Sequence, residues 1–232
     1  MQTLRAELPT PSDALDWGPV AARGQVPLLL VRHGQTRANV ERRFVGRTDV
    51  PLDDEGHRQA ARLAARLQAV PRAALYASPL ARARQTAEAL GEPPTLDEAL
   101  MELHQGELEG LDGPTAFARF PEVFAAWMSD PASAVIPGGE ALTACQSRGV
   151  AALTRIAQAH RPGPPVIVVS HQLLIVTTLL AALGQPLNGL RKLSQSNTAV
   201  NLLGWSEAEG LRVWVQNDRA HLEDPPAPDA AR

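Results

Sequence analysis

The residues that could do chemistry begin directly after a short apolar run near the N-terminus. Leu28–Val31 leads into Arg32, His33 and Gly34. The fork of an arginine side chain binds phosphoryl oxygens, and a neutral imidazole can attack the phosphorus atom. In open α/β sheets, ligands bind at the carboxyl ends of the strands. This segment therefore predicts a phosphoryl site, although the tripeptide alone fits an ordinary surface loop equally well.

Two further apolar runs end in side chains of the same kind. Ala74–Ala77 precedes Ser78, which is expected to cap a following helix that has Arg82 in its first turn. An arginine in that position opposes the helix dipole, and a bound anion would remove this cost. Val166–Val169 ends just before His171. The three strand ends together predict one pocket with two arginines and two imidazoles.

Strand-like and helical runs alternate along the chain, which is typical of an α/β domain. Apolar residues recur at helical spacing over residues 54–70, and Asp53 is placed to cap that helix. We therefore expect a three-layer α/β/α sandwich, in which a mostly parallel central sheet has helices on both faces and a small helical flap. The other expected elements are helices over 81–90, 140–160 and 172–183, and a closing hairpin of Ala199–Leu203 with Leu211–Val215.

The same alternation sets the expected domain boundaries. Residues 27–217 form the domain, and residues 104–136, which lack the alternation, form the flap inserted into it. Residues 1–26 are expected to be a loose N-terminal extension, in which Leu15 and Trp17 are the side chains that could pack on the domain. Residues 218–232 end in a stretch rich in Pro and Ala and are expected to be a disordered tail.

The composition excludes several classes of partner. With a net charge of −3, the chain has no basic field that would recruit nucleic acid. Its longest apolar stretch, Leu173–Leu183, is too short to cross a membrane, and no signal-peptide core is visible, so a cytoplasmic protein is expected. Cys145 is the single cysteine, which excludes a disulfide within the chain, and it is expected in the core. The oligomeric state is open, with a homodimer as one option.

Six sequence blocks follow one another in a characteristic order. They are Arg32–Thr36 with Asn39, Gly46–Leu52, Ser78–Ala87, Glu102 with Gly106–Gly110, Pro137–Glu140, and Val168–His171. In order and spacing these blocks resemble the histidine phosphatase superfamily, which includes the cofactor-dependent phosphoglycerate mutases. The resemblance covers about residues 27–215, which is nearly the whole predicted domain.

The resemblance implies a role for each residue of the predicted pocket. His33 would be the nucleophile and become phosphohistidine. Glu102 would protonate the leaving oxygen and would then act as the base that activates water. The phosphoryl oxygens would be held by Arg32, Arg82 and His171, with Asn39 as a further donor.

Elementary electrostatics agrees with these roles. Two neighbouring arginines disfavour the imidazolium form of His33 and leave it neutral for attack. A bound phosphate dianion favours the protonated form of Glu102, for which a solvated loop carboxylate is the competing interpretation. Because arginines can stabilise charge on phosphoryl oxygens, neither a metal nor an organic cofactor is required. Two further residues have weaker assignments: Glu140 is expected to cap its helix, and Asn197 could face the pocket.

The chain departs from the mutases at two places. Gln172 follows the second histidine, where most relatives have glycine, so it is a candidate substrate contact. The tyrosine and the lysine with which mutases hold the phosphoglycerate carboxylate are missing. Gln105 stands at the position of the tyrosine, and Gly113 stands at the position of the lysine.

These departures favour hydrolysis over return of the phosphoryl group to the same substrate. The expected function is that of a metal-independent phosphatase, a phosphomonoesterase of the histidine acid phosphatase type that acts on a small phosphorylated metabolite through phosphohistidine. The first alternative is a cofactor-dependent phosphoglycerate mutase. The second is a catalytically inactive phosphate-binding module.

Overall fold

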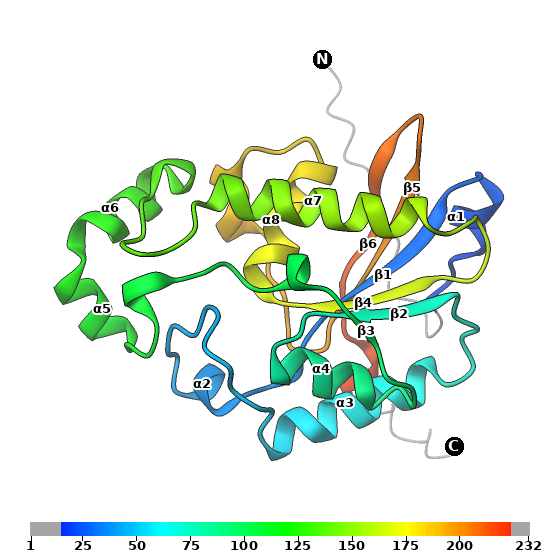
Figure 1. The fold of residues 1–232 in the computed structure, drawn as a ribbon, viewed down its shortest axis with the longest axis horizontal. Coiled ribbons are helices and arrows are strands. Elements are labelled where there is room, and N and C mark those ends of the chain that lie inside the picture. The colour runs from blue at the N-terminus through cyan, green and yellow to red at the C-terminus, as the bar shows by residue number, and fades with distance from the viewer. Residues whose placement is uncertain (1–14, 224–232) are drawn as a thin grey trace, which may run out of the picture.

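Six strands form a single sheet in the computed structural model, which describes residues 15–223 (Figure 1). The strand order is β3-β2-β4-β1-β5-β6. The pairs of β5 with β1 and with β6 are antiparallel, and the other three pairs are parallel. The mostly parallel sheet and the closing hairpin are therefore confirmed. The strands are β1 (Val26–Arg32), β2 (Ala74–Ala77), β3 (Thr95–Leu96), β4 (Val166–Ser170), β5 (Val200–Ser206) and β6 (Gly210–Asp218).

The register of the sheet aligns the ends of three parallel strands. Val31 of β1 pairs with Val169 of β4, and Val169 also pairs with Ala77 of β2. The segments that follow β1, β2 and β4 therefore leave the sheet side by side at one edge. Backbone pairing alone thus brings the three predicted site segments together.

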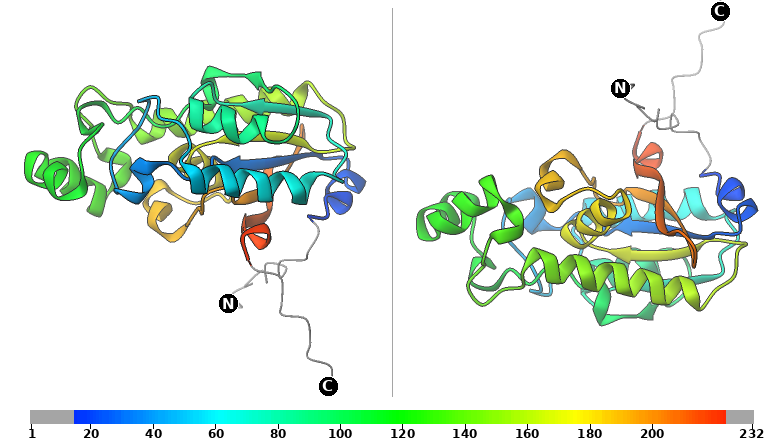
Figure 2. Two further views of the ribbon diagram at one scale, coloured as in Figure 1. Left: turned by 90° about the horizontal axis from the view of Figure 1, so that it is seen from below. Right: turned by 90° about the horizontal axis from the view of Figure 1, so that it is seen from above.

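Helices cover both faces of the sheet (Figure 2). Along β1, Leu29 and Val31 pack with α3 and α4, whereas Leu28 and Leu30 pack with α7 and α8. This alternation is the period of two expected of a strand covered on both sides, and the three-layer prediction is confirmed. The helices are α1 (Gly18–Ala22), α2 (Arg37–Val40), α3 (Asp54–Leu67), α4 (Ala81–Glu88), α5 (Gly113–Arg119), α6 (Pro121–Ser129), α7 (Leu142–Gln158) and α8 (Gln172–Ala182).

The first turns of α3 and α4 are capped by aspartates from different parts of the chain. Asp53 caps α3 as predicted, because its carboxylate accepts a hydrogen bond of 2.7 Å from the Gly56 N–H. The prediction that Ser78 caps α4 is wrong. At that helix the Asp49 carboxylate accepts from the Ala81 N–H at 2.6 Å, so a loop distant in sequence supplies the cap.

The N-terminal boundary differs from the expectation. Leu15 and Val20 are buried in the core on the α3 side of the sheet, and Trp17 packs against that core. The prediction of a loose extension is therefore wrong for residues 15–26, because their apolar side chains help to cover the sheet. Residues 1–14 of that prediction lie outside the described residues.

The fold also extends past residue 217. Arg66 on α3 holds Asp218 through two hydrogen bonds of 2.8 Å. A short 3₁₀ helix, Ala220–Leu222, then contacts α3. The prediction of a disordered tail is therefore wrong for residues 218–223, and residues 224–232 lie outside the described part of the chain.

The predicted flap contains α5 and α6, which lie beyond the carboxyl ends of the parallel strands (Figure 1). Its side chains Val123 and Phe124 share an apolar cluster with Cys145 of α7 and Leu174 of α8. Cys145 is thus a core residue, as predicted, and burial raises the pKa of its thiol to about 12. Short 3₁₀ helices elsewhere in the connections are Glu98–Leu100, Gly106–Leu108, Pro131–Ser133 and Leu187–Lys192.

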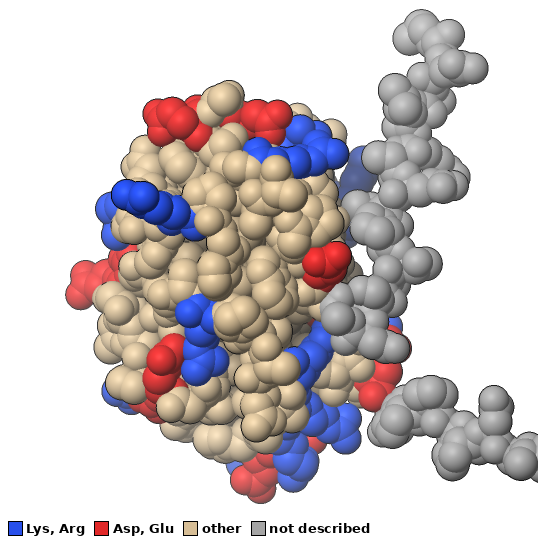
Figure 3. Space-filling view, turned by 90° about the vertical axis from the view of Figure 1, so that its right-hand side faces the viewer, with Lys and Arg blue, Asp and Glu red and all other residues tan. Residues whose placement is uncertain are grey.

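The surface carries charges of both signs. On the face drawn in Figure 3, basic and acidic side chains are interspersed, with neutral residues between them. Within residues 15–223, no helix has both the length and the hydropathy needed to cross a bilayer.

The close contact between the loop after β1 and the start of α3 gives a stability prediction. A Cβ on Gly56 would overlap the carbonyl oxygen of Gln35, and a Cβ on Gly34 would lie 2.7 Å from the Gly56 carbonyl oxygen. We expect Gly56→Ala to lower the free energy of unfolding by about 1–3 kcal/mol, because backbone must move to relieve the overlap. Urea denaturation measures this change.

Gly113→Ala is the matched control. Gly113 is the first residue of α5, and nothing lies within 4 Å of a Cβ placed there. Its effect should stay within about 0.5 kcal/mol. Equal effects of the two substitutions would contradict the packing argument.

Candidate active site

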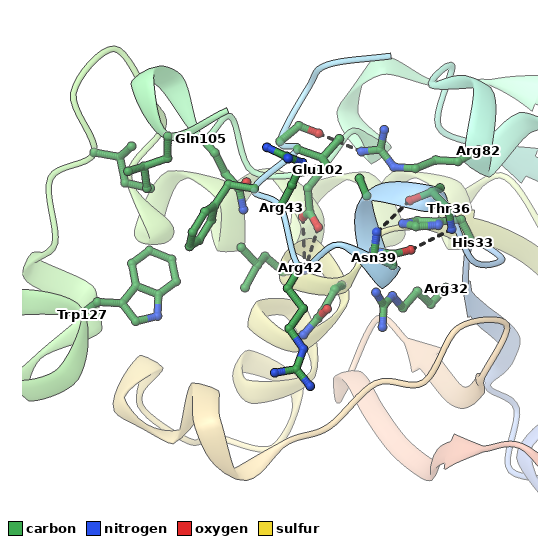
Figure 4. Close-up of a pocket in the computed structure, with 18 of the residues that line it drawn as sticks. Arg32, His33, Thr36, Asn39, Arg42, Arg43, Arg82, Glu102, Gln105 and Trp127 are labelled. Atoms are coloured by element: carbon green, nitrogen blue, oxygen red, sulfur yellow. Dashed lines mark hydrogen bonds between the residues drawn. The ribbon is translucent and has the colours of Figure 1, made fainter. Parts of the chain in front are cut away.

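The segments that follow β1, β2 and β4 meet at a cavity of about 630 Å³. Arg32, His33, Arg82 and Glu102 lie on its walls, as Figure 4 shows. Trp127 of the flap lies across the cavity from them. The structure therefore brings together residues that are far apart in the chain, although only one of the two predicted imidazoles, that of His33, lines the cavity.

His33 is oriented by the loop that carries it. Its Nδ1 lies 2.6 Å from the Gly34 carbonyl oxygen. Because a carbonyl oxygen can only accept a hydrogen bond, Nδ1 carries the proton and Nε2 keeps its lone pair. Asn197 holds the same loop, since its Nδ2 donates to the His33 carbonyl at 3.0 Å.

The surroundings of His33 keep its imidazole uncharged. Burial lowers the pKa of His33 well below its usual value, and the charges of Arg82 and Arg32 lower it further. The sequence had indicated the two arginines as the cause of the neutral imidazole. The structure shows that burial, which removes water from the ring, is the larger cause.

Arg32 and Arg82 are held by backbone carbonyl groups. Arg82 donates to the carbonyl oxygens of Gly46 at 2.8 Å and Thr48 at 3.0 Å, and Arg32 donates to that of Gln195. Burial lowers the pKa of Arg32 to about 10 and that of Arg82 below its usual value. With a pKa of about 10, Arg32 is still charged at neutral pH. A carbonyl dipole leaves more of a guanidinium charge available to an anion than a carboxylate would.

His171 lies beside His33 but does not itself line the cavity. The centroids of the two rings are 5.1 Å apart. His171 Nε2 is 2.8 Å from the Ser78 hydroxyl, which explains why Ser78 does not cap α4. The Nδ1 atom is buried and has no hydrogen-bond partner among residues 15–223. Burial is also the largest cause that lowers the pKa of His171 well below its usual value.

Glu102 is fixed at the N-terminus of α8. Its carboxylate accepts hydrogen bonds from the N–H groups of Leu173 and Leu174 at 3.1 Å, and from its neighbour Leu103 at 2.9 Å. The side chain is 7% exposed and faces the cavity. The interpretation of Glu102 as a solvated loop carboxylate does not fit this burial.

The segment that carries Glu102 is tied to α7 by the side chain of Arg148. Arg148 donates to the carbonyl oxygens of Ala99 at 2.9 Å and Met101 at 2.7 Å. Arg148 also binds both carboxylate oxygens of Glu140, at 2.9 and 2.8 Å. The prediction that Glu140 caps its helix is therefore wrong, because its side chain is taken by Arg148 and no side chain caps α7.

Asn39 and Gln172 also lie on the cavity wall. The side-chain Oδ1 of Asn39 accepts from the Thr36 N–H at 3.1 Å and from Asn197 Nδ2 at 3.3 Å, so the side-chain Nδ2 is the part left to donate. Gln172 is the exposed first residue of α8. Asn197, which the sequence indicated only weakly, is part of the site through both His33 and Asn39.

The apolar wall of the cavity was not predicted from the sequence. This wall includes Phe44, Phe117, Phe124 and Trp127. The sequence does contain a pattern that indicates it, because three of the four phenylalanines of the chain lie within residues 117–124 of the flap, close to Trp127. The carbonyl groups that hold the arginines were also missed, because every residue type carries a carbonyl.

Comparison with known proteins identifies the class to which this fold and site belong. A family model for the histidine phosphatase superfamily (branch 1) matches residues 28–218. The chain belongs to that superfamily, as its six sequence blocks indicated.

Individual relatives cover most of the chain. Phosphoglycerate mutase-like protein 4 of Arabidopsis thaliana is 35% identical over 205 residues, 85% of this chain and 87% of that protein. Bacillus stearothermophilus YhfR is 33% identical with a TM-score of 0.80, over 85% of this chain and 100% of that structure. The mycobacterial glucosyl-3-phosphoglycerate phosphatase, solved with VO3, is 29% identical with a TM-score of 0.74, over 83% and 98%. The superfamily contains phosphatases and mutases, so its shared chemistry is phosphoryl transfer.

The buried histidines make stability depend on pH. The pKa of His171 is lowered in the folded state, so below about pH 6.5 the unfolded chain takes up a proton that the folded chain does not. The free energy of unfolding should therefore fall as the pH drops below about 6.5. The contribution of one such histidine to the slope is about 1.4 kcal/mol per pH unit.

We expect His171→Asn to remove one such contribution, which urea denaturation between pH 8 and pH 5 measures. Between pH 7.5 and pH 8, where histidines are neutral in both states, the difference between wild type and variant should be constant. If the free energies of unfolding of wild type and variant differed by the same amount from pH 8 to pH 5, the assignment of His171 as a buried neutral group would be contradicted.

Proposed function

We propose that this protein is a metal-independent phosphatase that hydrolyses a small phosphomonoester through a phosphohistidine formed on His33. One observation carries the proposal: the hydrogen bond from His33 Nδ1 to the Gly34 carbonyl leaves Nε2 unprotonated beside two buried guanidinium groups. A neutral nitrogen nucleophile and fixed positive charge are what attack on a phosphate dianion requires.

In the first step, His33 Nε2 attacks the phosphorus atom and the bond from phosphorus to the ester oxygen breaks. The electron pair of that bond goes to the leaving oxygen, which takes a proton from Glu102. The α8 N-terminus holds the carboxyl group at the cavity wall, and the bound phosphate dianion favours the protonated form that this role requires. Arg32 and Arg82 stabilise the charge on the phosphoryl oxygens, and Asn39 and Gln172 are further donors at the same wall.

In the second step, a water molecule attacks the phosphorus atom and gives a proton to the Glu102 carboxylate. The bond from phosphorus to Nε2 breaks, which releases inorganic phosphate and returns His33 to its neutral form. His171 lies beside the His33 ring, and its buried Nδ1, which has no partner among the described residues, is the atom that could donate to a phosphoryl oxygen. The sum is one ester and one water converted to one alcohol and one phosphate.

The low pKa of His33 also supports the acid phosphatase type. A nucleophile that stays neutral below pH 6.5 retains its lone pair in mildly acidic solution. We therefore propose that kcat/KM does not fall with protonation of a free histidine near pH 6.5.

The mutase alternative finds less support in the cavity. A mutase has to hold the carboxylate of phosphoglycerate, and the tyrosine and lysine used for that purpose are replaced by Gln105 and Gly113. The wall opposite His33 is largely apolar, with Phe117 and Trp127 on the flap. Incubation with 3-phosphoglycerate separates the two functions, since a mutase primed with a bisphosphate yields the isomer and a phosphatase yields inorganic phosphate.

The central test is turnover of p-nitrophenyl phosphate in the presence of EDTA. Wild type should release phosphate, and His33→Ala should lose activity by about 10³-fold or more, because no other group forms the intermediate. Mass spectrometry of rapidly mixed protein, quenched in alkali, should show one added phosphoryl group in wild type only. His57→Ala, at an exposed position on α3, is the control that should keep its activity. Full activity in His33→Ala would overturn the proposal, and no turnover by wild type would favour an inactive binding module.

Glu102→Gln tests the assignment of the general acid. The variant keeps the size and most hydrogen-bonding capacity of the side chain but has no proton to give. We expect it to slow hydrolysis of alkyl phosphates about 10²-fold or more and to slow that of p-nitrophenyl phosphate much less, because only a poor leaving group needs the proton. The measurement is kcat/KM on both substrates, and equal losses would contradict the assignment.

A further inference from the structure

The cavity is much larger than a phosphoryl group requires, and its wall on the flap side differs chemically from the wall that holds His33. The wall there is formed by Phe44, Leu108, Phe117, Phe124, Trp127 and Ile136. We call these six side chains the apolar chamber. Figure 4 shows Trp127 across the cavity from Arg32 and His33, so the chamber and the phosphoryl end are parts of one cavity.

The aromatic side chains of the chamber support one another. The rings of Phe117 and Phe124 are stacked, with centroids 3.9 Å apart and an angle of 17° between the planes. Phe44 packs against Phe124 at 5.7 Å and lies in the segment after α2, close in sequence to His33. The chamber is therefore attached both to the flap and to the segment that carries the nucleophile, which fixes its position relative to the reacting atoms.

Part of this apolar surface is uncovered. Phe117 is 51% exposed and Met128, also on the cavity wall, is 54% exposed. Large apolar side chains gathered on a concave wall next to a charged centre are typical of a site that binds the apolar part of a ligand. A group joined to the phosphoryl oxygen and filling the cavity would cover them.

Two arginines on the cavity wall, Arg42 and Arg43, raise the alternative that the leaving group is negatively charged. Arg43 is engaged by Glu41 and by the Gly110 carbonyl, whereas no hydrogen bond or ion pair involves the Arg42 side chain within residues 15–223. An anionic leaving group could therefore use Arg42. The observations favour an apolar group. The aromatic wall is extensive, whereas the Arg42 side chain is exposed to solvent and gains less from pairing with an anion.

We infer that the apolar chamber selects phosphomonoesters whose leaving alcohol has an apolar body of aromatic size. This inference rests on the proposed function, since the leaving alcohol is the part of the substrate that would occupy the chamber. It goes further in naming the chemical class of that alcohol and the residues that recognise it.

The test compares 2-naphthyl phosphate, phenyl phosphate and 3-phosphoglycerate as substrates of the full chain. The two aryl esters have leaving groups of similar acidity, so their ratio reports contact with the second ring rather than chemical reactivity. We expect kcat/KM for the naphthyl ester to exceed that for the phenyl ester about tenfold, with 3-phosphoglycerate lowest.

Phe117→Ala should reduce the naphthyl to phenyl ratio to roughly threefold or less, because half-exposed Phe117 contributes chamber wall rather than core. Inhibition by inorganic phosphate checks that the phosphoryl end is intact in this variant. Phe120→Ala is the matched control, since Phe120 is on the same flap but lines a different hollow with Pro121 and Val135. It should keep the wild-type ratio.

Binding separates failure of this inference from failure of the proposed function. Calorimetry with naphthylmethylphosphonate and methylphosphonate, which are not hydrolysed, should show about tenfold tighter binding of the naphthyl compound. Hydrolysis of all three esters without a naphthyl preference would overturn the inference and leave the phosphatase proposal standing. Naphthyl-selective binding without any hydrolysis would support the apolar chamber as a binding site and would overturn the phosphatase proposal. Preference for 3-phosphoglycerate, lost in Arg42→Ala, would overturn the apolar class in favour of an anionic one.

Discussion

The site depends on the hydrogen bond between His33 Nδ1 and the carbonyl oxygen of its neighbour Gly34. This contact decides which ring nitrogen carries the proton, and it can do so only while the ring is neutral. Neutrality in turn follows from burial and from the charges of Arg32 and Arg82. The arrangement therefore combines a nitrogen lone pair with excess positive charge in one small volume, which is a combination that attracts a phosphate dianion and presents it with a nucleophile.

Burying two guanidinium groups is costly, and the fold offsets this cost with carbonyl groups from distant loops. Arg82 is held by Gly46 and Thr48, and Arg32 is held by Gln195. These neutral partners hold both guanidinium groups without cancelling their charge, so an anion in the cavity still gains a strong interaction. The loops around the cavity are thus positioned by the same groups that would bind substrate, which ties the local stability of the site to its chemistry.

The remaining parts of the cavity come from separate elements of the fold. Pairing of β1 with β4 sets His33 beside the start of α8, where the helix N-terminus holds Glu102. Arg148 of α7, which also pairs with Glu140, donates to the Ala99 and Met101 carbonyl groups and so ties the segment before Glu102 to α7. The flap adds most of the apolar wall, to which Phe44 also contributes. Charge is therefore concentrated at the carboxyl ends of the strands, whereas the surface that would contact the leaving group comes mainly from an insertion.

The sequence by itself determined the three-layer architecture and the gathering of charged residues at strand ends, because periodicity, caps such as Asp53 and strand-end positions are local patterns. Only the tertiary structure decided that Ser78 bonds a histidine instead of capping α4, and that Glu140 pairs with Arg148. It also decided that residues 15–26 and 218–223 belong to the fold. Side chains that can bond to several partners take the partners that folding brings close. Every residue has a backbone carbonyl group, so residue type does not show that the carbonyl of Gly34 would be the one to orient His33.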